Sequence, residues 1–259
     1  MRRPRTNRVA LREQISGLLR RVTFSQTALR ICEQTGDARM EEFLQKVLTA
    51  ELGNREETRQ ARYLREAGFP VYKTLEGYDF SNVKLPPLLV RETLDRGDFV
   101  EEHKNLVLYG PVGTGKTHLA TAIGVAACAA GYHVRFFTAA ELVVRLSEAF
   151  ATGTLEKLIH TILKAQLLII DEWGYVPVDR QGAQLLFRIV SDSYERRSLI
   201  LTTNLEFSKW GTLFTDDQMA AAMIDRVAHH GHIILFEGES YRMKHALMRQ
   251  NGPLKIPTR

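Results

Sequence analysis

Eight consecutive residues have the types and the order that bind the phosphates of a nucleoside triphosphate. They match the P-loop pattern at every required position. Glycines in such a loop adopt positive φ angles and let the backbone approach the phosphates closely. The lysine adds a positive charge at the β- and γ-phosphates, and the following hydroxyl is a ligand for Mg²⁺. The segment consists of Gly110, Pro111, Val112, Gly113, Thr114, Gly115, Lys116 and Thr117, and His118 is taken with it as a nucleotide-binding residue.

This loop needs a strand before it and a helix after it, because that arrangement aims backbone N–H groups and the positive helix end at one point. From residue 104 onward, short apolar runs alternate with helical patterns. The alternation predicts an α/β fold of the P-loop NTPase type, a parallel sheet with helices on both faces. The expected strands are 106–109, 134–138, 167–172, 199–203 and 232–236, and the expected helices are 87–97, 139–151, 154–165, 180–196, 216–229 and 240–250.

Polar residues follow two of the expected strands, where ligands of parallel sheets bind. Asp171 comes after four apolar residues and can reach the cation held by Thr117, directly or through water. Glu172 is one step further and can act as general base toward an attacking water. Asn204 ends the next strand and could orient that water, although asparagine is also a common strand terminator.

Two arginines are candidates for phosphate contacts. Arg226 lies on the expected helix 216–229 and could stabilise the charge on a transferring phosphoryl group. Arg242 follows the last strand and is the second candidate. For both residues, a surface salt bridge is the alternative interpretation.

The composition excludes several classes of protein. The chain has 259 residues, of which 44% are hydrophobic and 25% charged, as in ordinary globular proteins. No apolar run approaches the roughly 20 residues of a membrane-spanning helix, and no secretory signal is evident. Cys32 and Cys128 fall on apolar faces of expected helices, which indicates reduced core residues in a cytoplasmic protein.

Positive charge is concentrated at the N-terminus. Residues 1–70 contain 14 Lys and Arg against 9 Asp and Glu, while residues 71–259 are neutral. Such an arm fits contact with a polyanion, and the alternative is a solvated tail without a partner. The arginines that begin it are Arg2, Arg3, Arg5 and Arg8.

Helical patterns fill residues 9–68. Thr23 is expected to cap a second helix and Asp37 a third, and Asn54 with Glu57 is expected to start a fourth. The third helix has the spacing of a core-facing helix, with apolar positions Met40, Phe43, Leu44, Val47, Leu48 and Leu52. The predicted organisation is a helical domain over 1–68 that contacts DNA or a partner, a linker over 69–86 and an ATPase domain over 87–259.

The order of the motifs resembles the AAA+ ATPases of the DnaC/IstB branch. The matching segments are 110–117 as Walker A, 168–172 as Walker B, 202–204 as sensor 1, 225–226 as the arginine-finger box and 240–242 as sensor 2. Further runs resemble the IstB transposition helper proteins of insertion sequences. These runs are 171–177, 184–187, 193–196, 203–205, 207–211 and 229–230. Trp173 departs from the family pattern, which usually has a small aliphatic residue there.

The resemblance implies ATP bound with Mg²⁺ between subunits, and a ring or spiral homo-oligomer that encloses DNA. It implies a trans-acting role for Arg226, a separate transposase as partner and a role in preparing target DNA. The helices at 139–165 correspond to the element that lines the DNA path, with Arg145, Lys157 and Lys164 as its basic candidates. The short C-terminal segment implies that the full helical lid of many AAA+ proteins is missing.

Three alternatives stay open at this point. A replicative helicase loader of the DnaC type would use the N-terminal domain to grip a helicase. A P-loop small-molecule kinase would need several arginines in a substrate lid, and residues 139–166 contain only Arg145. A nucleotide-binding scaffold without turnover is disfavoured by Glu172.

Overall fold

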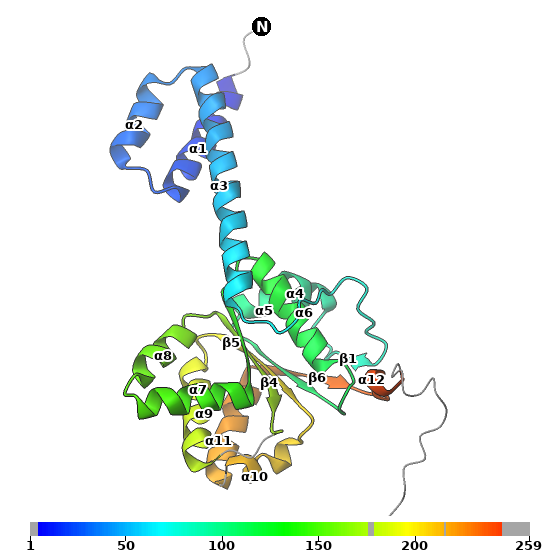
Figure 1. Cartoon of the computed structure of the whole chain (residues 1–259). Coiled ribbons are helices and arrows are strands. Elements are labelled where there is room, and N and C mark those ends of the chain that lie inside the picture. The colour runs from blue at the N-terminus through cyan, green and yellow to red at the C-terminus, as the bar shows by residue number, and fades with distance from the viewer. Residues whose placement is uncertain (1–4, 176–178, 215, 245–259) are drawn as a thin grey trace, which may run out of the picture. The chain divides into compact units, whose positions relative to one another are not determined.

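The chain divides into two units, Met1–Ala61 and Arg62–Arg259. The computed structural model of Figure 1 describes residues 5–175, 179–214 and 216–244, and leaves aside the side chains of residues 5–8 and 33. Because the positions of the two units relative to one another are not determined, each unit is considered by itself.

The first unit is built from helices α1 (Arg5–Arg21), α2 (Gln26–Thr35) and the first part of α3 (Ala38–Glu66). Its core is small and consists of Ile15, Leu19, Val22, Leu29 and Leu48. Ser25 caps α2 by accepting a hydrogen bond from the backbone N–H of Ala28, so the predicted cap at Thr23 is wrong. Thr23 instead has a positive φ of 61° and makes the turn between the helices.

Helix α3 runs for 29 residues without a break, so the predicted boundary at Asn54 is also wrong. A glycine such as Gly53 costs a helix about 1 kcal/mol, which is too little to end one whose remaining residues favour it. The prediction that α3 turns all its apolar residues inward is wrong as well. Leu48 is buried, but Met40, Phe43 and Val47 are exposed.

The second unit contains a six-stranded sheet in the order β1-β6-β2-β5-β4-β3. The five strands from β6 to β3 are parallel, as predicted, and β1 adds a short antiparallel edge on β6. The strands are β1 (Val83–Lys84), β2 (Asn105–Tyr109), β3 (Val134–Thr138), β4 (Leu167–Trp173), β5 (Ser198–Thr203) and β6 (Gly231–Phe236).

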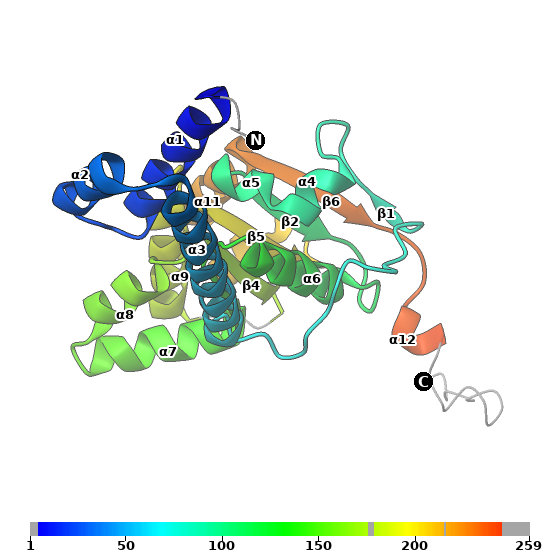
Figure 2. The same cartoon turned by 90° about the horizontal axis from the view of Figure 1, so that it is seen from above.

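Helices cover both faces of this sheet, as Figures 1 and 2 show. The central strands therefore contain runs of consecutive apolar residues, and alternate residues enter opposite cores. In β4, Leu167 and Ile169 belong to the core under α6, whereas Leu168 and Ile170 belong to the core under α7 and α9. The helices are α4 (Arg91–Arg96), α5 (Asp98–Glu101), α6 (Lys116–Ala129), α7 (Ala139–Ala151), α8 (Leu155–Ile162), α9 (Arg180–Ser193), α10 (Gly211–Phe214), α11 (Asp217–His229) and α12 (Tyr241–Lys244), with the 3-10 turn η1 (Phe207–Lys209).

Two segments of this unit differ from the sequence-based expectation. The segment 69–86, expected to be a linker, contributes β1, in which Val83 pairs with Phe236. The helix expected over 87–97 is two short helices, because Gly97 adopts a left-handed φ of 74° between α4 and α5. The expected helix 240–250 is seen only as α12, since residues 245–250 lie outside the described part.

Neither cysteine is in a disulfide. Cys128 is buried in α6, and burial raises the pKa of its thiol to about 12. Among the described helices, none combines the length and the apolar character that crossing a membrane requires.

Candidate functional site

The predicted P-loop lies between β2 and α6, at the carboxyl edge of the sheet. Gly110, Gly113 and Gly115 have φ angles of 156°, 80° and 99°, which residues with a side chain rarely adopt. A Cβ atom at Gly113 would lie 2.1 Å from Oγ of Ser240. The loop therefore needs glycine at this position for its backbone and for the chain that packs on it.

The side chain of Lys116 is folded into the loop. Its ammonium donates to the carbonyl oxygens of Gly110 and Pro111, at 2.7 Å each, and the residue is only 6% exposed. Burial lowers the pKa of Lys116 to about 8, with a further decrease from the charge of Arg242 and an opposing effect of Asp171. The structure thus holds a cation beside the backbone that would surround the phosphates.

Asp171 of β4 meets the loop directly. The Thr117 hydroxyl donates to Oδ1 of Asp171 at 3.0 Å, and the Thr202 hydroxyl of β5 donates to the same oxygen. Asp171 is 3% exposed. A hydroxyl and a carboxylate side by side form a hard oxygen donor set of the kind that Mg²⁺ prefers. The residues predicted to bind Mg²⁺ therefore fit that ion.

Glu172 has an unusual backbone conformation. Its φ is 60°, and its N–H donates to the Thr202 hydroxyl at 3.0 Å. The pairing of β4 with β5 shifts between Ile170 and Trp173. This irregularity lets Glu172 stay exposed at the edge of the sheet while Asp171 and Trp173 on either side are buried.

Thr202 was predicted only as part of the sensor 1 segment and without a role of its own, although it orders both acids of β4. Its role depends on the order of the strands, because β5 pairs with β4 on one side and β2 on the other. The run of threonines before Asn204 was the available signal in the sequence. Asn204 follows the last residue of β5 and is exposed at the same edge.

Helix α12 packs on the P-loop. The backbone N–H of Tyr241 donates to the carbonyl of Gly113 at 2.9 Å. Arg242 is one of the charges that act on Lys116, whose pKa is lowered mainly by burial, and on Tyr175, whose pKa is raised mainly by burial. Arg242 therefore lies within electrostatic range of the loop. The structure therefore brings Arg242 to the predicted site.

Arg226 lies at the opposite edge of the sheet. Helix α11 ends at His229, and the next strand begins with Gly231, which pairs with Asn105, the first residue of β2. The P-loop follows the other end of β2, roughly 13 Å away for a five-residue strand. The Arg226 guanidinium donates to the carbonyl of Ala222 at 2.8 Å and lies over the Phe187 ring at 5.1 Å. Arg226 is thus not part of its own chain's phosphate site.

The segment before the sheet returns to the P-loop and adds a residue that the sequence did not indicate. The ring of Tyr78 contacts that of His118, with centroids 5.1 Å apart, and its hydroxyl lies 3.2 Å from a Cβ placed on Gly115. Burial raises the pKa of Tyr78 to about 12, and burial with the charge of Lys73 lowers the pKa of His118. In the sequence, only the aromatic residues between positions 72 and 80 could have indicated that this segment contacts the P-loop.

Three of the predicted DNA-contacting residues lie in the second unit, on α7 and in or just after α8. Arg145 pairs with Glu141 at 2.6 Å and lies over the Phe137 ring at 5.5 Å. Lys157 and Lys164 are exposed in and after α8. Of the basic arm, Arg2 and Arg3 lie outside the described residues, and so do the side chains of Arg5 and Arg8 within α1.

Comparison with protein families decides the affiliation. The profile of the family described as "IstB-like ATP binding protein" matches residues 19–249. The chain belongs to this family. Its P-loop, the acids of β4 and the end of β5 all lie within the matched range.

Relatives of this IstB-like chain support the same assignment. The "Insertion sequence IS21 putative ATP-binding protein" of Pseudomonas aeruginosa is 40% identical over 204 residues, which cover 78% of this chain and 77% of the relative. The "Insertion sequence IS5376 putative ATP-binding protein" of Geobacillus stearothermophilus is 37% identical over 210 residues, which cover 81% of this chain and 83% of the relative.

Solved structures show the fold of the IstB-like chain. The replication initiator DnaA bound to AMPPCP and single-stranded DNA has a TM-score of 0.50 and 21% identity, and the match covers 70% of this chain and 56% of that one. AMPPCP-bound DnaA from Aquifex aeolicus has a TM-score of 0.50 and 22% identity, and the match covers 73% of this chain and 58% of that one. The predicted α/β fold, a parallel P-loop sheet with helices on both faces, is confirmed.

Proposed function

We propose that this IstB-like protein hydrolyses ATP in a Mg²⁺-dependent reaction at a site shared between two copies of the chain. We also propose that it assembles on DNA and assists a transposase. The observation that carries the proposal is the meeting of the P-loop with the first acid of β4, through the hydrogen bond from Thr117 to Asp171. This contact combines a phosphate cradle with a divalent-cation donor set at one point.

Each residue of the carboxyl edge then has a role. Lys116 and the loop N–H groups would hold the β- and γ-phosphates, and Thr117 with Asp171 would hold Mg²⁺. When bound, this ion would supply positive charge to the phosphoryl oxygens. Glu172 accepts the proton of the attacking water, and Asn204 orients that water. Arg242 contributes a further positive charge from α12.

A shared site is supported by the position of Arg226. Its guanidinium lies at the amino edge of the sheet, while the phosphates would lie at the carboxyl edge. An arginine so placed can act only on a nucleotide held by a neighbour. A cation delivered in this way is worth about 10³–10⁵ in rate. We propose a ring or spiral in which each copy supplies Arg226 to the next.

DNA and transposase association is supported by the relatives and by charge. Two relatives are named as ATP-binding proteins of insertion sequences, and the DnaA structure of the same fold contains single-stranded DNA. Residues 1–70 carry a net charge of +5, which suits a phosphate backbone. We propose the helical part, 1–68, and Arg145, Lys157 and Lys164 as DNA contacts. The segment 69–86, which also adds β1 to the sheet, would connect the helical part to the ATPase domain, 87–259. We propose that the protein acts in the cytoplasm, where such partners are found.

The proposal is tested by measuring DNA binding with and without ATP. Wild type is expected to bind duplex DNA as an oligomer only with ATP, and Lys116→Ala is expected to lose ATP binding and DNA assembly together. The control is Lys84→Ala, which removes an exposed lysine paired with Glu237 at 2.6 Å and leaves the P-loop intact. Oligomerisation of Lys116→Ala on DNA to the wild-type extent would contradict the proposal.

The partner is tested in a pull-down with the transposase of the same insertion sequence and with a replicative helicase. We expect the ATP-bound protein to retain the transposase. Retention of the helicase in place of the transposase would assign the chain to helicase loading.

A further inference from the structure

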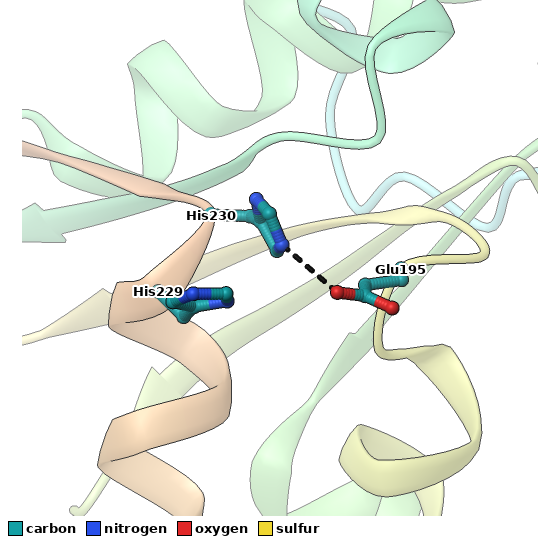
Figure 3. Close-up of side chains that lie close together, drawn as sticks. All are labelled: Glu195, His229 and His230. Atoms are coloured by element: carbon teal, nitrogen blue, oxygen red, sulfur yellow. Dashed lines mark hydrogen bonds and ion pairs between the residues drawn. The ribbon is translucent and has the colours of Figure 1, made fainter.

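Away from the P-loop, two histidines and a glutamate lie close together at the amino edge of the sheet. We propose that Glu195, His229 and His230 form a binding site for a divalent transition metal such as Zn²⁺. One ligand atom from each residue lies within 4.8 Å of the others. Figure 3 shows the two rings, from the end of α11, facing the carboxylate, which comes from the turn between α9 and β5.

The backbone explains why adjacent histidines converge. Successive residues of an α-helix point about 100° apart, but α11 ends at His229. His230 has φ −116° and ψ 34°, outside the helical range, and this change of direction brings the two ring centroids to 4.2 Å. Glu195 has a left-handed φ of 58°, which places its carboxylate oxygen 3.1 Å from Nε2 of His230.

A second interaction orients His229 as it would orient a metal ligand. The Tyr194 hydroxyl is hydrogen-bonded to Nδ1 of His229 at 2.7 Å. Histidines that bind metals commonly use one ring nitrogen for the metal and the other for such a partner. Nε2 of His229 is therefore the nitrogen left for coordination.

The donor set selects the class of metal. Two imidazole nitrogens and one carboxylate oxygen suit Zn²⁺, Co²⁺ or Ni²⁺ better than Mg²⁺ or Ca²⁺, which prefer oxygen ligands. All three side chains are exposed, so they can rotate to close the remaining distance. Three protein ligands leave a fourth position for water.

Such a metal would fasten two segments that are distant in sequence. It would join the turn after α9 to the junction of α11 and β6, one helical turn after Arg226. The inference does not depend on the proposed ATPase function, because metal binding is measured without nucleotide.

The test is titration of the full chain, freed of any affinity tag and of nucleotide, with Zn²⁺ by calorimetry and with Co²⁺ by visible absorption. Neutral or slightly alkaline buffer keeps imidazole unprotonated. We expect one ion per chain and the d–d bands of Co²⁺ with nitrogen ligands. His229→Ala and His230→Ala should each weaken binding by more than about 100-fold, and Tyr194→Phe by roughly 10–100-fold, as for loss of an outer-shell partner.

The control variant is His160→Ala, which removes an exposed histidine of α8 outside the cluster and should leave affinity unchanged. Circular dichroism confirms that each variant is folded. If wild type binds no ion, or if the His229 and His230 variants bind as tightly as wild type, the proposal is overturned. In that case the cluster is only a hydrogen bond between His230 and Glu195.

Discussion

Replacing Thr202 with valine tests the arrangement of the two acids most selectively. Valine keeps the shape of threonine and removes only the hydroxyl. That hydroxyl donates to Asp171 and accepts the N–H of Glu172 at 3.0 Å. Thr202 is 2% exposed, so bulk water does not replace the lost group.

The magnitude follows from the two hydrogen bonds. A hydrogen bond to a charged group contributes about 1.5–3 kcal/mol, and a donor left unsatisfied costs about 1–3 kcal/mol. Glu172 also has a φ of 60°, a conformation that costs roughly 1–2 kcal/mol and that the Thr202 bond helps to hold. We expect Thr202→Val to lower the free energy of unfolding by about 2–4 kcal/mol. Displacement of Glu172 should lower kcat about 10–100-fold.

The assay combines urea unfolding with steady-state ATP hydrolysis. The chain has two tryptophans, Trp173 and Trp210, which lie 5.5 Å apart in the ATPase unit, so their fluorescence reports on that unit. Thr202→Ser keeps the hydroxyl and is the matched control, with kcat near that of wild type. A valine variant as stable and as active as wild type would refute the role assigned to Thr202.

Three further predictions concern the same edge of the sheet. Glu172→Gln should bind ATP as wild type does but hydrolyse it at least about 10²-fold more slowly. It should therefore accumulate as an ATP-bound oligomer in size-exclusion chromatography. An unchanged rate of hydrolysis would contradict the assignment of Glu172 as general base. Burial lowers the pKa of Lys116 to about 8, so its ammonium loses its proton as the pH rises through that value. The Kd for ATP should therefore rise by up to about tenfold per pH unit above it. A Kd that stays constant up to pH 9 would contradict this prediction. Gly113→Ala, whose Cβ would lie 2.1 Å from Ser240, should weaken ATP binding about tenfold or more. Gly153→Ala is the control, because Gly153 has a φ of 70° but nothing within 4 Å of its Cβ position, and this variant should bind ATP as wild type does. Equal affinity of the two variants in an ATP titration would argue against the fit of α12 on the loop.

Patterns that are local in the chain were predictable from the sequence. Helix α7 has the predicted bounds, 139–151, because Thr138 caps it and its apolar spacing is regular. The P-loop and Asp171 were predictable because each follows a run of consecutive apolar residues. The sequence therefore indicated which residues meet at the carboxyl edge.

Features that depend on distant pairing were not predictable. Strand β1 has two residues, and its partner in β6 lies about 150 positions later, so no local pattern marks it. Thr202 reaches Asp171 only because β5 lies beside β4. In α3, local signals at Asn54 favoured a new helix, but continuation of the existing helix was the more favourable outcome.

The central claim is that one chain holds the nucleotide and the next supplies Arg226. The direct measurement is ATP turnover of Arg226→Ala and Lys116→Ala proteins, alone and mixed in equal amounts with DNA present. Each variant should be inactive alone, and the mixture should recover up to about one quarter of wild-type activity, the share of head-to-tail interfaces with both groups intact. No recovery on mixing, or full activity of Arg226→Ala alone, would contradict a shared site.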